Sequence, residues 1–326
     1  MSMHDSITAL IMAALAGTFN LAAAAPENLS GDLSVHDPSR IVRCGEDYWL
    51  FATGNGILSR HSKDLAHWEA GPRIFTNRPA WTTQAVPGFR GHCWAPDVIR
   101  LGDRFGVYFS VSTWGSQTSA IGLVTNPTLD PADPAYGWTD HGIVIRSSPE
   151  DNFNAIDPAI FRDRDNSLWM AFGSFWSGIK LVQLNPTTGL RIALDSPITA
   201  LAWKSAIEAP ALTRHGDFYY LFVNWDQCCR GTNSTYNIRV GRSITIHGPY
   251  LDRDGLELLT GGGSLVLKTE GRYIGPGHVS FVTHEKREFM AHHYYDGERG
   301  GATTLGLRPL YWDEEGWPTI ALPQKP

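Results

Sequence analysis

The chain has 326 residues, of which 18% are charged, and its formal net charge at pH 7 is -6. Because it has neither a surplus of Lys and Arg nor a block of like charges, the sequence excludes the usual electrostatic basis for nucleic-acid binding. Its four cysteines are too few and too scattered for a disulfide scaffold and lack the spacing of a structural zinc site, so the core must come from apolar packing.

The N-terminus carries an uncharged apolar stretch, residues 7–25, which ends in small residues that suit a signal peptidase site. Residues 1–5 lack the Lys or Arg of an ordinary secretory signal. Polar residues and glycine interrupt the stretch, and no later segment is apolar over the ~20 residues that a membrane span needs. We expect residues 1–25 to be a signal peptide and residues 26–326 to form one secreted, monomeric domain without a membrane partner.

One sequence unit then recurs five times, and each copy has the pattern of a β-hairpin. It consists of an apolar strand, a short polar turn and a second strand rich in aromatic residues. The first strands of the copies include Ile41, Val98, Ile160, Leu212 and Val279, so they are about 50 to 70 residues apart. This spacing fits a propeller blade of four strands with its loops. The sequence therefore predicts an all-β, five-bladed β-propeller.

A polar residue stands just before the first strand of each copy. The five segments are Asp37-Pro38, Pro96-Asp97, Asp157-Pro158, Glu208-Ala209-Pro210 and His278. The first strand of every blade lines the central channel, so we expect these groups to converge on a catalytic cleft across the axis. A β-sandwich also has many short strands, but it gives no reason for one polar motif to recur at this spacing.

Three of these residues, Asp37, Asp157 and Glu208, are candidate catalytic carboxylates. Glycoside hydrolysis commonly uses one carboxyl group as a proton donor and a second to activate water or attack the sugar, and a third can tune the donor. The apolar sequence neighbours of Glu208 predict a raised pKa, which suits a general acid. Polar His36 and Ser39 favour an ionised Asp37, which suits a general base. A single Asp before Pro is more often a turn residue, but three such contexts argue against that interpretation.

These segments, together with residues 92–97 and 173–178, resemble the endo-1,5-α-L-arabinanases of glycoside hydrolase family 43. The resemblance extends from residue 33 to residue 318. It implies an inverting enzyme that cleaves α-1,5-L-arabinofuranosidic bonds in arabinan and arabino-oligosaccharides. It also implies that Asp37 is the general base, Glu208 the general acid and Asp157 the residue that holds and tunes the acid, whereas Asp97 has a structural role.

The resemblance further implies which residues contact the sugar. Aromatic rings pack against the apolar faces of sugars, and polar groups hydrogen-bond their edges. The implied residues are Asp37, Trp94, Trp114, Gly115, Asn154, Ala155, Ile156, Asp157, Ser174, Phe175 and Trp176.

Members of this family also carry a His at the propeller centre near a bound calcium or similar ion, and His278 matches it. Calcium prefers oxygen ligands, so we expect an ion that is held largely through water. Two further histidines, His292 and His293, alternate along a late strand and point to opposite faces. This alternation predicts core or surface roles for them and no joint site.

The adjacent cysteines, Cys228 and Cys229, have two interpretations. In an oxidising compartment they form a vicinal disulfide, and otherwise they are two small apolar residues. Their order in the sequence does not decide between the two.

Three alternative functions remain for a propeller of this kind. A fructan or sucrose hydrolase expects Arg-Asp-Pro in the middle blade, but here Arg162-Asp163 is followed by Arg164. A family 43 β-xylosidase or arabinofuranosidase has the same three acids, usually in a pocket rather than an open groove. A propeller that binds glycan without turnover is the non-enzymatic alternative. The loop motifs favour an arabinanase, and attack within the polymer or from its end stays open.

Overall fold

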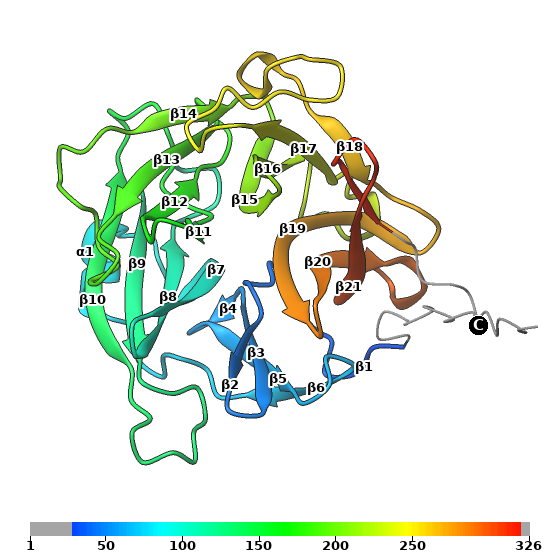
Figure 1. Ribbon diagram of the computed structural model, residues 1–326. Coiled ribbons are helices and arrows are strands. Elements are labelled where there is room, and N and C mark those ends of the chain that lie inside the picture. Colours follow the sequence, from blue (N-terminus) through cyan, green and yellow to red (C-terminus); the bar gives the residue numbers. More distant parts are fainter. Residues whose placement is uncertain (1–27, 321–326) are drawn as a thin grey trace, which may run out of the picture.

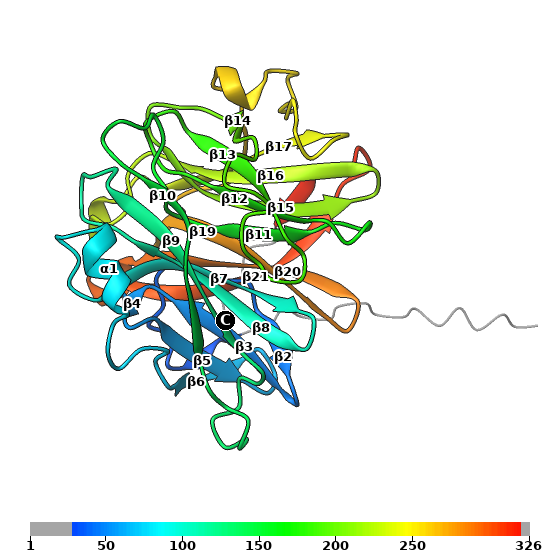
Figure 2. The ribbon, with the colours of Figure 1, turned by 90° about the vertical axis from the view of Figure 1, so that its left-hand side faces the viewer.

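Five β-sheets surround a central axis in the computed structural model, which describes residues 28–320 (Figure 1). The prediction of an all-β, five-bladed propeller is confirmed. Figure 2 shows the ring from the side, with the short helix α1 (Ala80–Ala85) beside β9 on the outside of the second blade. The predicted signal peptide lies outside the described residues. Within residues 28–320, no helix is long and apolar enough to cross a membrane.

Each blade is an antiparallel sheet whose first strand is the innermost one. Blade I contains β2 (Val42–Cys44), β3 (Asp47–Ala52), β5 (Leu58–Ser62) and β6 (His67–Gly71), and blade II contains β7 (His92–Leu101), β8 (Arg104–Val111), β9 (Ser119–Asn126) and β10 (Thr139–Ser147). Blade III contains β11 (Ala159–Arg162), β12 (Leu168–Phe172), β13 (Ile179–Leu184) and β14 (Thr199–Ala202). Blade IV contains β15 (Ile207–His215), β16 (Phe218–Trp225), β17 (Asn237–Ser243) and β18 (Ser264–Leu267), and blade V contains β19 (Tyr273–His284), β20 (Arg287–Asp296), β21 (Ala302–Trp312) and β22 (Pro318–Ile320).

The predicted hairpins are the first two strands of each blade. Their connections are short turns, and three of them use a glycine, Gly45 (φ 61°), Gly102 (φ 58°) and Gly216 (φ 57°), in the left-handed conformation that tight hairpin turns require. Two short strands join neighbouring parts of the ring. β1 (Ser30–Gly31) pairs in parallel with β6 at the outer edge of blade I, and β4 (Gly54–Asn55) pairs with β7 of blade II.

Five apolar clusters, one between each pair of neighbouring blades, form the core. The cluster between blades V and I joins the two ends of the chain, where Leu50 and Trp68 pack with Ala291 and Leu305. Among the described residues, no strand from one end of the chain completes the sheet at the other end. The ring is therefore closed by side-chain packing, with a few hydrogen bonds such as that from the Leu305 amide to the Leu33 carbonyl at 2.9 Å.

A left-handed residue lies before the inner strand in blades I and III and within the first half of that strand in blades II, IV and V. These residues are Asp37, Ala95, Asp157, Ala209 and His278, with φ between 42° and 59°. Proline follows four of them, and a non-glycine residue with positive φ is uncommon. The fivefold recurrence identifies the equivalent position in every blade.

The predicted shared position of the five polar residues is therefore wrong for two of them. Glu208 lies one residue before the left-handed Ala209, and Asp97 lies two residues after Ala95. Irregular strand pairing beside both residues explains the offset. The Asp97 carboxylate accepts hydrogen bonds from the amides of Arg40 at 3.0 Å and Ile160 at 2.7 Å, which joins blades I, II and III and confirms its structural role.

Candidate active site

A cleft of about 990 Å³ lies at the end of the axis where the inner strands begin, and residues of all five blades line it. Asp37, Asp157 and Glu208 are all part of this lining. Residues that are as much as 171 positions apart in the sequence thus meet in one site. The predicted convergence on a cleft across the axis is confirmed, because each blade delivers its strand entry to the same place.

Asp37 lies among hydroxyl and imidazole groups. The Thr53 hydroxyl donates to Asp37 Oδ2 at 2.5 Å, and His36 Nδ1 is 2.7 Å from the same oxygen. On the other side, Nδ1 of His278 and Nδ1 of His293 are 3.4 and 3.5 Å from Asp37 Oδ1. Four polar side chains therefore hold both oxygens of this carboxylate.

The electrostatic surroundings favour the ionised form of Asp37. Burial alone would raise the pKa of its carboxyl group, but His36, His278 and His293 outweigh burial and hold that pKa well below the usual range. Burial lowers the pKa of His36, yet the negative charge of Asp37 reverses this effect and raises it. Asp37 is consequently a carboxylate at neutral pH.

Glu208 has a contrasting environment on blade IV. The Ser174 hydroxyl donates to its Oε2 at 2.8 Å, and the Tyr236 hydroxyl donates to its Oε1 at 2.8 Å. Burial raises the pKa of Glu208, and the two donated hydrogen bonds oppose this effect only in part. The predicted rise in its pKa is thus present, and burial is its principal cause.

Asp157 lies next to Glu208 and is bound by the backbone. The Asp157 amide donates to Ser110 Oγ at 2.9 Å, and its Oδ2 accepts from the Ala209 amide at 3.1 Å, one residue beyond Glu208. Burial raises the pKa of Asp157, and the negative charges of Glu208 and Asp37 raise it well above the usual value. Two adjacent buried carboxyl groups thus retain a proton more readily than isolated ones.

Aromatic residues of blades II and III form one wall of the cleft. Trp94 and Trp114 meet edge to face, with ring centroids 6.4 Å apart, and Trp114 is 77% exposed. Trp176 is 40% exposed, and Phe175 precedes it in a loop whose amide at Phe175 bonds to the Ile207 carbonyl at 2.7 Å. These four rings give this wall an apolar surface of the kind that packs against the apolar face of a sugar.

The other predicted sugar-binding residues take different positions. Gly115, Asn154, Ile156 and Ser174 line the cleft. Ala155 is fully buried in the apolar cluster between blades II and III, so it lies behind the cleft surface.

Several residues at the site were not assigned to it from the sequence. The Thr53 hydroxyl donates to Asp37, and the Tyr236 hydroxyl donates to Glu208. The Tyr295 hydroxyl forms a hydrogen bond with His36. His292 and His293 are both fully buried, which agrees with the core role predicted from their alternation. His293 has a second role, because its Nδ1 accepts a hydrogen bond from the Asp37 amide at 3.1 Å. The only sequence signal was its position in the innermost hairpin of blade V.

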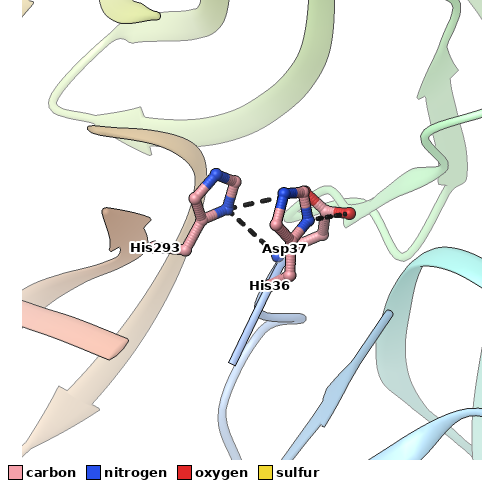
Figure 3. Close-up of side chains that lie close together, drawn as sticks. All are labelled: His36, Asp37 and His293. Atoms are coloured by element: carbon pink, nitrogen blue, oxygen red, sulfur yellow. Dashed lines mark hydrogen bonds and ion pairs between the residues drawn. The ribbon is translucent and has the colours of Figure 1, made fainter. Parts of the chain in front are cut away.

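Three of these groups form a candidate metal site, shown in Figure 3. His36, Asp37 and His293 each offer a ligand atom, and these atoms lie within 4.8 Å of one another. The two imidazole rings stack with centroids 4.0 Å apart. A donor set of two nitrogens and one carboxylate suits a transition metal better than calcium, which prefers oxygen ligands. His278 lies between the cleft and the central channel, with Nδ1 directed at Asp37.

The adjacent cysteines, Cys228 and Cys229, form a vicinal disulfide, which decides between the two interpretations of this pair. Both residues line the cleft. The other cysteines, Cys44 and Cys93, are free.

Comparisons with known proteins agree with this geometry. The profile of glycosyl hydrolases family 43 matches residues 31–318. The extracellular exo-α-(1→5)-L-arabinofuranosidase ArbA of Cellvibrio japonicus is 43% identical over 301 residues, which cover 88% of this chain and 86% of that protein. The extracellular endo-α-(1→5)-L-arabinanase 1 of Bacillus subtilis is 38% identical, with 87% of each chain covered.

A solved structure supports the same relationship. The α-L-arabinanase of Cellvibrio cellulosa complexed with arabinohexaose superimposes with a TM-score of 0.85 and 42% identity, covering 89% of this chain and 96% of that chain. The match of the family profile over most of the sequence, the identity to full-length relatives and the shared propeller together show that the chain belongs to glycosyl hydrolases family 43.

Proposed function

We propose that this protein hydrolyses α-1,5-L-arabinofuranosidic bonds in arabinan with inversion of configuration. The observation that carries the proposal is the set of three carboxyl groups that line one cleft, of which Asp37 has a lowered pKa and Asp157 and Glu208 have raised ones. The relatives support the substrate class, because their names specify α-1,5-linked arabinan and one solved relative holds arabinohexaose.

In this proposal Asp37 is the general base. Its carboxylate, held ionised by the surrounding imidazoles, accepts a proton from the water that attacks the anomeric carbon. Glu208 is the general acid and delivers its proton to the departing glycosidic oxygen. Asp157 accepts a hydrogen bond from the Ala209 amide and so holds the peptide that follows Glu208. As the neighbouring carboxyl group, it also tunes the acid in this proposal. Asp37 thus gains one proton from water, and Glu208 gives one proton to the departing alcohol, so the net reaction consumes one water molecule.

The contact residues implied by the family resemblance remain part of the proposal. Trp94, Trp114, Phe175 and Trp176 pack against apolar sugar faces, and Asn154 and Ser174 offer polar contacts. Ala155 contributes through its backbone position rather than through its side chain, which is fully buried.

Attack within the polymer is the mode of action that we propose. An open cleft lined by all five blades supports this mode, as does the endo-acting relative of Bacillus subtilis. Release of sugar from the chain end is a second candidate, which the exo-acting relative of Cellvibrio japonicus favours.

Incubation of the purified protein with linear α-1,5-arabinan tests both levels of the proposal. We expect the viscosity to fall faster than reducing ends accumulate, with a mixture of arabino-oligosaccharides early in the reaction. Early release of a single short product with little loss of viscosity would contradict the endo mode only. Activity confined to xylan or fructan would contradict the substrate class, and binding without turnover would identify a non-catalytic glycan-binding propeller.

For the metal, we propose calcium or a similar ion near His278, held largely through water. The position of His278 between the cleft and the central channel supports this placement. When bound, such an ion would add positive charge near Asp37. Elemental analysis of the purified protein, before and after dialysis against a chelator, tests its presence, and a protein free of divalent metal would contradict the proposal.

We also propose that residues 1–25 are a secretion signal and that residues 26–326 are the mature, monomeric enzyme. The extracellular relatives support secretion. N-terminal sequencing of protein recovered from culture medium should begin near residue 26, and an intact N-terminus would contradict cleavage.

A further inference from the structure

The vicinal disulfide lies inside the cleft, in the β16–β17 loop. Cys228 is half-buried, Cys229 is exposed, and both residues line the cleft together with Glu208 and Tyr236. The same loop ends at Tyr236, whose hydroxyl donates to Glu208. A single connection of blade IV therefore carries both the disulfide and a residue that binds the proposed acid.

Hydrogen bonds hold this loop in a defined conformation. Gln227 and Thr235 pair across its base, where the Thr235 amide donates to the Gln227 carbonyl at 3.0 Å and the Gln227 amide donates to Thr235 Oγ1 at 3.2 Å. The Arg230 amide donates to Ser234 Oγ at 3.0 Å. The position of the disulfide thus follows from the closed loop.

The tip of the loop is also bound to blades V and I. The Cys229 amide donates to the Tyr295 hydroxyl at 2.7 Å, and Cys229 Sγ is 3.7 Å from His36 Nε2. The same Tyr295 oxygen is 3.0 Å from His36 Nε2. The disulfide consequently crosses from blade IV toward the residue that precedes the proposed base.

The two sides of the cleft differ in their apolar surface. Blades II and III supply Trp94, Trp114, Phe175 and Trp176. On the side of blades IV, V and I, the aromatic lining residue Tyr236 is only 2% exposed. A disulfide is polarizable and weakly polar, so it suits an apolar sugar face better than it suits the hydroxyl edge.

We propose that the Cys228–Cys229 disulfide is a contact surface for one arabinofuranosyl unit, on the side of the cleft away from the aromatic wall. This inference rests on the proposed function, because it assigns a binding residue to the same site. Contact with the disulfide increases the affinity of the cleft for substrate and does not take part in proton transfer. The proposed acid and base keep their own hydrogen bonds from Tyr236, Ser174 and Thr53.

Reduction of the wild-type protein with a phosphine tests the proposal. Because Cys44 and Cys93 are free thiols, reduction opens only the Cys228–Cys229 bond. We expect KM for arabinohexaose to rise about fivefold, the change expected when roughly 40 Å² of apolar contact area between the protein and the sugar is lost. We expect kcat to change less than twofold, and reoxidation to restore KM. Mass spectrometry verifies the redox state at each step.

The C228S/C229S variant repeats the measurement without a reductant, and a C44S variant treated with the phosphine is the matched control. A KM that stays constant in both the reduced protein and the double variant would overturn the inference. A fall in kcat with a shifted pH profile and constant KM would also overturn it, because the disulfide would then act through His36. If the double variant does not fold, the reversible reduction of the wild type decides.

The proposed function has a separate outcome in this experiment. An oxidised wild-type protein that does not cleave arabinan at all refutes the proposed function. Cleavage of arabinan with no effect of reduction on KM refutes only the role of the disulfide.

Discussion

The two sides of the catalytic cleft contain the same chemical group in opposite electrostatic environments. Asp37 of blade I is surrounded by three imidazoles, whereas Asp157 and Glu208 lie beside each other and receive hydrogen bonds from neutral donors. Burial raises the pKa of all three carboxyl groups, and only at Asp37 do the neighbouring imidazoles outweigh burial and lower it. The lesson is that burial favours the protonated form of every carboxyl group in the cleft, and that neighbouring positive charge is needed to keep one of them ionised.

Substitution of the proposed base or the proposed acid removes one side of this contrast and should give the largest loss of activity. We expect Asp37→Asn and Glu208→Gln each to lower kcat by about 10²- to 10⁴-fold, the usual contribution of a placed acid or base. Steady-state kinetics on linear arabinan measure this loss. Glu46→Gln, in the exposed β2–β3 turn outside the cleft lining, is the matched control and should keep full activity. If either site variant turns over at the wild-type rate, the roles are wrong.

The aromatic wall should show a smaller effect that acts on binding. We expect Trp176→Ala to raise KM by about tenfold, because an aromatic contact contributes on the order of 1 kcal/mol beyond the area that it covers. The melting temperature should change little, since Trp176 is 40% exposed. Ile244→Ala, at a side chain that is 73% exposed and outside the cleft lining, is the control. An unchanged KM in Trp176→Ala would remove this residue from the sugar-binding surface.

The sequence predicted those features that depend on a single blade. Five hairpins and five strand entries are local patterns, and Asp37 and Asp157 could be placed because a proline follows each at the strand entry. Glu208 lies one residue before the position that is equivalent to Asp37 and Asp157. The pairing between β15 and β16 is irregular there, and strand periodicity alone does not reveal such an irregularity.

Contacts between blades were the part that the sequence did not reveal. His293 reaches the Asp37 amide across 256 residues, and the Tyr295 hydroxyl meets both His36 and the Cys229 amide. Strand alternation correctly put His292 and His293 on opposite faces, but it does not indicate which blade each face meets. Only the closure of the ring, which packs blade V against blade I, supplies that information.

The smallest expected effect is a displacement of the pH profile in which each substitution moves mainly one limb. The proposed mechanism requires an ionised Asp37 and a protonated Glu208, so the acid limb should follow the low pKa of Asp37 and the alkaline limb the raised pKa of Glu208. Removing the cation in His36→Gln raises the pKa of Asp37, so we expect the acid limb to move to higher pH. Removing a donor that favours ionised Glu208 in Tyr236→Phe raises the pKa of the acid, so the alkaline limb should move to higher pH.

Profiles of kcat/KM against pH for the two variants and the wild type provide the measurement. His36→Gln keeps the hydrogen bonds to Glu208, and Tyr236→Phe keeps the imidazoles around Asp37, so each variant is the control for the other. The charge of His36 also lowers the pKa of Glu208, but as the smallest of its causes, so His36→Gln should move the acid limb more than the alkaline limb. A larger movement of the alkaline limb in His36→Gln, or of the acid limb in Tyr236→Phe, would contradict the contrast between the two environments.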